Sequence, residues 1–189
     1  MPENSAAIGS VIITGASSGF EPIARADART LILGSLPSQL SLKTGEYFAN
    51  PRNVFWRIMG DLVGAGPELS YAARKEWMLA DGFAVWDVLE SAVRPGSLDA
   101  SIESETAKPN DFVQFLREHP GIWRVCFNGQ KAAEIFERRV VAGIEEQASS
   151  MDFVTLPSTS PAHAAMKYEE KLKRWSIIMT GPEVVQENS

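Results

Sequence analysis

Residues 30–56 read TLILGSLPSQLSLKTGEYFANPRNVFW, and this stretch decides the fold. It opens with a short apolar run, LIL, of the length expected for a buried strand. The run ends at Gly34, in a segment of small residues and proline that lets the backbone approach a ligand closely and stiffens the turn. Phe55 and Trp56 then open a helical pattern. Because ligands bind beyond the carboxyl ends of strands in open α/β sheets, we expect the functional site here.

Apolar runs alternate with helical patterns along the rest of the chain. Further strands are predicted at 83–89, 122–127 and 153–156, and helices at 51–63, 70–80, 110–119, 129–141 and 163–179. Residues 94–108 are polar, contain proline and glycine, and are predicted to form a long loop. This alternation predicts an α/β fold, a three-layer α/β/α sandwich around a central, mostly parallel sheet of about four strands.

Length and composition limit the classes of protein. At 189 residues and 20.7 kDa we expect a flexible leader over 1–20, a single domain over 21–180 and a disordered acidic tail over 181–189. The single cysteine, Cys126, allows neither an internal disulfide nor a four-cysteine iron–sulfur cluster, and two histidines make a structural zinc site improbable. No cofactor is expected. No apolar run approaches the ~20 residues of a membrane span, so we expect no membrane partner and a cytoplasmic location. We also expect a monomer.

Six short motifs follow one another in order between Gly34 and His163. They are GSLPS at 34–38 with Asn53, WDV at 86–88, GSLD at 96–99, NDF at 110–112, FNG at 127–129 and LPSTSPAH at 156–163. Together they resemble the uracil-DNA glycosylase superfamily, and within it the hypoxanthine-DNA (deoxyinosine) glycosylases most closely. The resemblance implies a monofunctional glycosylase of base excision repair. Such an enzyme flips a deaminated base out of damaged DNA and hydrolyses its N-glycosidic bond, leaving an abasic site.

The resemblance also implies which residues bind the base. The implied substrate-binding residues are Gly34, Ser35, Leu36, Pro37, Ser38, Tyr47, Phe48 and Asn128. Phe48 matches the aromatic platform on which a base stacks, with Tyr47 as the fallback, and the alternative is an ordinary core aromatic. Asn128 could read a base edge, although its position before Gly129 is more typical of a helix cap.

Asn53 and Asp87 are the candidate catalytic residues. Asn53 matches the asparagine held responsible for catalysis in the hypoxanthine-excising family. Its amide could orient water through the carbonyl or donate to the base, and the alternative is a residue that satisfies backbone groups at a helix start. Asp87, at a predicted strand end, could read the base edge, activate water or cap a loop.

Leu36 departs from related families and bears on the substrate. It stands where mismatch-specific and thymine-excising relatives carry their catalytic asparagine, and the chain lacks the Asp-Pro-Tyr-His motif of the most active uracil enzymes. Hypoxanthine is therefore expected as the substrate. A uracil or mismatch-specific (G:U/G:T) glycosylase is the alternative.

The segment 157–161 matches the second motif of the superfamily, which presses into the duplex and pinches phosphates. The implied DNA-binding residues are Ser158, Thr159, Ser160, Pro161 and His163. The alternative is a simple connector in which Ser160 caps a helix. Asp99 and Asp111 are expected to be structural, one in a turn and one in the first turn of a helix.

A net charge of −6 and a pI of about 5.0 count against an extended nucleic-acid surface. Lys43, Arg52, Arg94 and Lys167 lie within or beside the candidate loops, whereas acidic residues collect at 134–152. We therefore expect a local basic face on an acidic body, with weak affinity for undamaged DNA.

Three other functions stay open at this point. TGASSG at 14–19 resembles a dehydrogenase nucleotide loop, but Pro22 opposes the helix that such a loop requires, which leaves an oxidoreductase as a distant alternative. A hydrolase using Ser158 or Ser160 with His163 would lack the Gly-x-Ser-x-Gly elbow. A degenerate glycosylase that binds DNA without cleaving it is the third.

Overall fold

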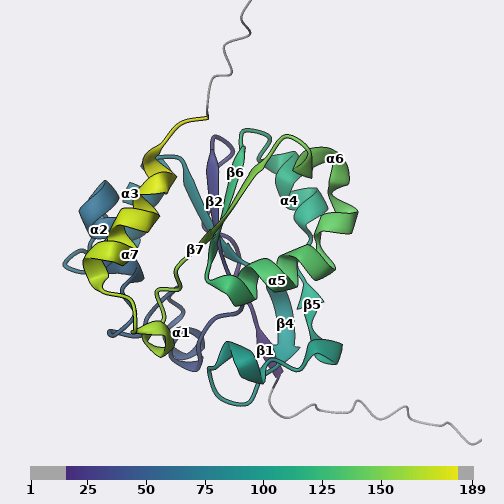
Figure 1. Cartoon of the computed structure of the whole chain (residues 1–189), viewed down its shortest axis with the longest axis horizontal. Helices are drawn as coiled ribbons and strands as arrows, with labels where there is room; N and C mark the ends of the chain where they lie inside the picture. The colour runs from purple at the N-terminus through teal and green to yellow at the C-terminus, as the bar shows by residue number, and fades with distance from the viewer. Residues whose placement is uncertain (1–15, 183–189) are drawn as a thin grey trace, which may run out of the picture.

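The computed structural model describes residues 16–182, and a parallel four-stranded sheet lies at its centre. The sheet has the order β3–β2–β6–β7, with β2 at Thr30–Gly34, β3 at Phe83–Asp87, β6 at Arg124–Asn128 and β7 at Asp152–Leu156. Helices α2 (Phe55–Val63), α3 (Tyr71–Ala80) and α7 (Tyr168–Trp175) cover one face (Figure 1). Helices α4 (Phe112–Glu118), α5 (Gln130–Arg139) and α6 (Glu145–Ala148) cover the other. The predicted three-layer α/β/α sandwich is confirmed.

Strand β2 shows why two helical layers are needed. All five of its residues are buried, and successive side chains of a strand point to opposite faces. Leu31 and Leu33 therefore pack with the side chains of α4 and α5, while Ile32 packs with those of α2, α3 and α7. A strand that is apolar on both faces can be stable only between two covering layers.

A second, three-stranded antiparallel sheet was missed by the sequence analysis. It has the order β1–β4–β5, with β1 at Ala16–Ser18, β4 at Leu89–Val93 and β5 at Lys108–Pro109. Residues 16–20 were predicted to lie in a flexible leader, and this is wrong, because β1 pairs with β4 and the Phe20 carbonyl accepts a hydrogen bond from Trp86 Nε1. The rest of the predicted leader, 1–15, and most of the predicted tail, 183–189, lie outside the described residues.

The remaining differences concern element boundaries. The strand predicted at 83–89 divides into β3 and β4, and the helix predicted at 163–179 divides into η4 (Pro161–His163), α7 and η5 (Ser176–Met179). Short α1 (Gln39–Thr44), η1 (Asp99–Ser101), η2 (Ser104–Thr106) and η3 (Val141–Gly143) complete the described chain. Ser70 caps α3 and Asp111 caps α4, since each side chain accepts a hydrogen bond from the first turn of its helix.

Between residues 16 and 182, no helix combines the length and the apolar character that crossing a membrane requires. In the same range, no group of three or more His, Cys, Asp or Glu side chains is arranged to hold a metal ion.

Candidate active site

The carboxyl ends of the parallel strands open into a cavity of about 640 Å³, which is within the usual size of a small-molecule site. Every site residue predicted from the sequence lines it, namely Gly34, Ser35, Leu36, Pro37, Ser38, Tyr47, Phe48, Asn53, Asp87, Asn128, Ser158, Thr159, Ser160, Pro161 and His163. Further lining residues not proposed for the site from the sequence are Ser41, Asn50, Arg52, Ser97, Leu98, Asp99 and Ala100. The two loops that carry the main motifs therefore border one space.

The first loop, Gly34–Ser38, is held from behind by Arg94. This side chain is 1% exposed, and its guanidinium donates hydrogen bonds to the backbone oxygens of Leu36 and Pro37. The expectation that Arg94 belongs to a basic surface is wrong. Arg94 is an internal cation that binds the loop carbonyls, and its Nη1 lies 3.9 Å from Asp99 Oδ1. Ser35 Oγ donates to Asp99 Oδ1 at 2.6 Å, so Asp99 also braces the loop.

Asp87 ends β3 with its side chain buried at the cavity wall. The residue is 2% exposed, and its Oδ2 atom has no hydrogen-bond partner among the described residues. A Cβ on Gly34 would lie 2.5 Å from Asp87 Oδ1, so a larger residue at position 34 would displace this carboxyl group. The Asp87 backbone oxygen, rather than its side chain, binds the segment before α4, because it accepts a hydrogen bond from Asn110 Nδ2 at 2.9 Å.

The electrostatic surroundings of Asp87 favour the protonated carboxyl. Burial raises its pKa most, the negative charge of Asp99 raises it further, and the positive charge of Arg94 opposes both, giving a pKa of about 8. Asp87 is thus the described carboxylic acid most strongly shifted towards the neutral form at physiological pH.

Phe48 lines the cavity in a strained backbone conformation. Its φ is 56°, the only positive value among the described non-glycine residues. The ring stacks on Phe55, with 3.9 Å between centroids and 27° between planes. A bulky residue in the left-handed region costs on the order of 1–3 kcal/mol, and such residues cluster at ligand sites. Tyr47, by contrast, is 3% exposed and packs edge-on against Phe20, as a core residue does.

Asn53 lies between the two loops. Its Oδ1 accepts a hydrogen bond from the Phe55 backbone N–H at 3.0 Å, which starts α2. The next residue, Val54, donates its backbone N–H to the Thr159 carbonyl at 3.1 Å, joining this segment to the second loop. The carbonyl oxygen of the Asn53 amide is thus used by the helix start, whereas its Nδ2 group donates no hydrogen bond within the described chain.

The second loop, 157–161, is also braced from behind. Lys171 is 4% exposed and donates from Nζ to the Ser158 and His163 carbonyls at 2.6 and 3.3 Å. Burial lowers the pKa of this ammonium group. Asn128 Nδ2 donates to Thr159 Oγ1, and Thr159 N donates to Asn128 Oδ1, both at 2.8 Å. The helix-cap interpretation of Asn128 is wrong, since its amide binds Thr159 instead of the first turn of α5.

Comparison with known proteins identifies the family. The sequence matches the Uracil DNA glycosylase superfamily over residues 22–178. The chain belongs to the uracil-DNA glycosylase superfamily.

Individual relatives agree with this assignment. Proteins named hypoxanthine DNA glycosylase from Methanosarcina acetivorans and Methanosarcina barkeri are 35% and 33% identical over 117 residues, which is 61% of this chain and 73% of each relative. The solution NMR structure of a candidate uracil DNA glycosylase from Methanosarcina acetivorans superposes with a TM-score of 0.71 and 30% identity, over 86% of this chain and 96% of that one.

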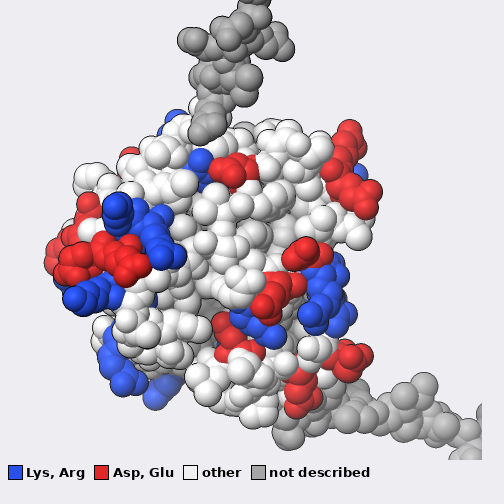
Figure 2. Space-filling model, in the orientation of Figure 1, with Lys and Arg blue, Asp and Glu red and all other residues white. Residues whose placement is uncertain are grey.

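The charge distribution of this superfamily member is mixed. Figure 2 shows acidic and basic side chains interspersed over one face, with basic side chains at the lower left, over the loops beside α1. Lys43, Arg52 and Lys167 are exposed, and Arg52 lines the cavity, whereas Arg94 is buried. The basic groups near the site are therefore few, and the remaining positive charges at the loops are the internal ones of Arg94 and Lys171.

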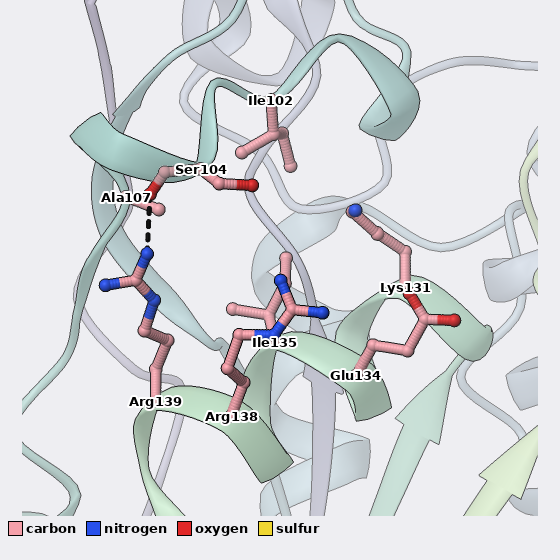
Figure 3. A pocket seen from close by; sticks show the side chains of 8 residues that line it. All are labelled: Ile102, Ser104, Ala107, Lys131, Glu134, Ile135, Arg138 and Arg139. Atoms are coloured by element: carbon pink, nitrogen blue, oxygen red, sulfur yellow. Dashed lines mark hydrogen bonds between the residues drawn. The ribbon is translucent and has the colours of Figure 1, made fainter.

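A second hollow lies apart from this glycosylase-type cavity, between η2 and α5 (Figure 3). The side chains of Lys131, Arg138 and Arg139 reach towards it from α5, and Arg139 donates to the Ser104 carbonyl at 2.7 Å. Its volume is about 20 Å³, enough for about one water molecule and too small for a base.

Two alternatives from the sequence are not compatible with the geometry. Of the residues that resemble a nucleotide loop, Thr14 and Gly15 lie outside the described residues and Ala16–Ser18 form strand β1. No helix follows Gly19 to meet a pyrophosphate. Ser158 Oγ and Ser160 Oγ accept hydrogen bonds from backbone N–H groups within the loop, and in the described chain neither is bonded to His163. Ser160 does cap η4, as the connector interpretation predicted.

Proposed function

We propose that this protein is a monofunctional DNA glycosylase that removes hypoxanthine from deoxyinosine in DNA and leaves an abasic site. One observation carries the proposal: an aromatic ring, a carboxamide, a buried carboxyl group and two braced loops line a single cavity of about 640 Å³. The names of the Methanosarcina relatives support hypoxanthine as the base. Leu36 supports it further, because this apolar residue stands where mismatch-specific and thymine-excising relatives carry their catalytic asparagine.

The base enters the cavity as an everted nucleotide. Phe48 offers a ring already held by Phe55, so stacking the base requires little further ordering. Asn53 Nδ2 donates a hydrogen bond to the base as negative charge develops on it in the transition state. This assignment follows from the Phe55 N–H, which occupies the carbonyl side of the amide. The attacking water approaches C1′ from the opposite side of the sugar.

The two loops hold the strand on either side of the everted nucleotide. Hydroxyl and backbone N–H groups of residues 158–160 bind phosphate oxygens, and Pro161–Ala162 enter the space that the base leaves. The ammonium group of Lys171 lies directly behind this loop and contributes positive potential without lying on the surface. An enzyme with a net charge of −6 can thus bind phosphates locally.

The proposal is tested with end-labelled duplexes that carry one deoxyinosine, deoxyuridine or deoxyxanthosine, or a G:T mispair. After incubation with the purified protein, alkali cleaves the strand at any abasic site. We expect cleavage of the deoxyinosine strand after alkali and none before it, because no lyase step takes place. Faster cleavage of deoxyuridine would favour the uracil alternative, and cleavage of no substrate would leave a protein that binds DNA without excising a base.

Replacing Phe48 with leucine is expected to weaken productive binding of deoxyinosine DNA by about 10–100-fold, since a base–aromatic stack is worth about 1–3 kcal/mol. The enzyme concentration that gives half-maximal single-turnover rate measures this effect. Phe48→Tyr is the matched control, because it keeps the ring and should stay within a few-fold of the parent protein. Equal losses in both variants would contradict a stacking role.

A further inference from the structure

The Asp87 carboxyl group is unusual among the groups that line the cavity, because the protein leaves it without a partner. It is 2% exposed, and no described residue donates to or accepts from Oδ2. Gly34 is packed so closely against Oδ1 that a methyl group there would collide with it. An unpaired buried polar atom costs about 1–3 kcal/mol, so a carboxyl group kept in this state at a ligand cavity indicates a bond made only to the ligand.

The groups around Asp87 determine its charge. Arg94 and Asp99 are the charged residues that act on it, and the phenols of Tyr47 and Tyr71 face it from the α1–α2 segment and from α3. Both phenols are shifted to higher pKa, chiefly by burial, and so stay neutral. With its own pKa at about 8, the Asp87 carboxyl carries a proton at neutral pH. A protonated carboxyl is a hydrogen-bond donor and an acid.

We infer that Asp87 is the general acid of the reaction and donates its proton to a ring nitrogen of the departing purine, N7 or N3. This inference rests on the proposed glycosylase function. Water attacks C1′, the bond between C1′ and N9 breaks, and its electron pair enters the purine. The Asp87 proton moves to the ring nitrogen, the attacking water loses a proton to the solvent, and Asp87 takes up a proton from the solvent after the base has left. The sum is one water consumed, one neutral hypoxanthine released and one sugar with a hydroxyl group at C1′.

This role bears on the choice of base. A purine has unprotonated ring nitrogens besides the one in the glycosidic bond, so an acid can neutralise the base as it leaves. Uracil has no such nitrogen, since its other ring nitrogen carries a hydrogen and only carbonyl oxygens accept. A buried neutral acid therefore favours excision of a purine over excision of uracil.

The test measures the single-turnover rate constant on deoxyinosine duplex from pH 5.5 to 9.5 for the parent protein, Asp87→Asn and Asp99→Asn. We expect the parent rate to fall as pH rises through about 8, because the acid loses its proton. Asp87→Asn should lose about 10²–10⁴-fold at neutral pH and lack this fall. Asp99→Asn keeps an acceptor for Ser35 Oγ but removes a charge that raises the Asp87 pKa, so its midpoint should move to lower pH.

The Asp99→Asn shift is the decisive readout, because ionisation of deoxyinosine itself would give the same midpoint in every variant. Duplexes with 7-deazadeoxyinosine or 3-deazadeoxyinosine identify the acceptor: Asp87→Asn should have no further effect on the analogue that lacks the protonated nitrogen. Thermal melting confirms that each variant is folded. An unchanged pH midpoint in Asp99→Asn would overturn the inference, and so would parent-like rates in Asp87→Asn, but neither result would affect the proposed function. Absence of excision by the parent protein would refute the proposed function itself.

Discussion

Asn53→Ala is expected to lower the single-turnover rate of hypoxanthine excision by about 10²–10³-fold, the usual cost of removing one transition-state hydrogen-bond donor. The amide is oriented by the Phe55 N–H, so its Nδ2 needs no reorganisation when charge develops on the base. The substitution also removes the acceptor at the start of α2, which costs about 1 kcal/mol of stability. Binding of the uncleaved duplex should change little, because the donor acts mainly in the transition state.

Asn53→Asp separates the chemical role from the structural one. Aspartate accepts the Phe55 N–H as well as asparagine does, so the start of α2 and the melting temperature should be retained. Its ionised carboxylate cannot donate to the base and places negative charge beside it. We therefore expect a loss at least as large as that of alanine. Recovery of the parent rate in Asn53→Asp would contradict the donor role and indicate that residue 53 acts through its oxygen.

The central sheet could be predicted from local pattern, and the residues of the cavity from the resemblance of the motifs to a known family. β2 and β6 are apolar runs that end at short polar motifs, and parallel strands bring their carboxyl ends to one edge of the sheet. Motifs that follow such strands must meet, which is why residues as distant as Gly34 and His163 line one cavity. The spacing of these motifs could not show which side chains are buried, which are hydrogen-bonded and which carry a proton.

The small sheet and the internal cations could not be predicted in this way. β1 is three residues long and exists only because β4, more than seventy positions later, pairs with it. Arg94 is read from sequence as a surface cation in a polar loop, and only the fold shows that the carbonyls of Leu36 and Pro37 lie against it. Lys171 lies beside the apolar Leu172 on α7 and is likewise buried. Non-local contacts decide all three.

Arg94 and Lys171 solve the same problem at the two loops. Each loop must direct hydroxyl and N–H groups towards the cavity, so its carbonyl groups point into the protein, where water cannot satisfy them. A buried cation with several donors binds two of these carbonyls at once: Leu36 and Pro37 by Arg94, Ser158 and His163 by Lys171. The shape of each loop therefore depends on one internal side chain outside the motif.

Arg94→Ala is accordingly expected to destabilise the protein by about 3 kcal/mol, from two buried carbonyls left without donors and the space vacated by the side chain. For a chain of this size that lowers the melting temperature by roughly 10 °C. Below the transition, the Gly34–Ser38 loop loses its brace, and excision should fall although Arg94 does not line the cavity. Calorimetry and the single-turnover assay at 15 °C measure the two effects separately.

Arg94→Lys is the matched control, because it keeps the positive charge but not the planar fork that reaches two carbonyls together. If the fork matters, lysine should recover only part of the stability and of the excision rate. The pH midpoint for Asp87 should stay near that of the parent protein, because lysine keeps the positive charge. Full recovery by lysine would mean that the charge alone holds the loop. Parent-like stability in Arg94→Ala would mean that the Gly34–Ser38 loop keeps its shape without the charge or the fork of Arg94. Arg94 would then have no role in forming the site.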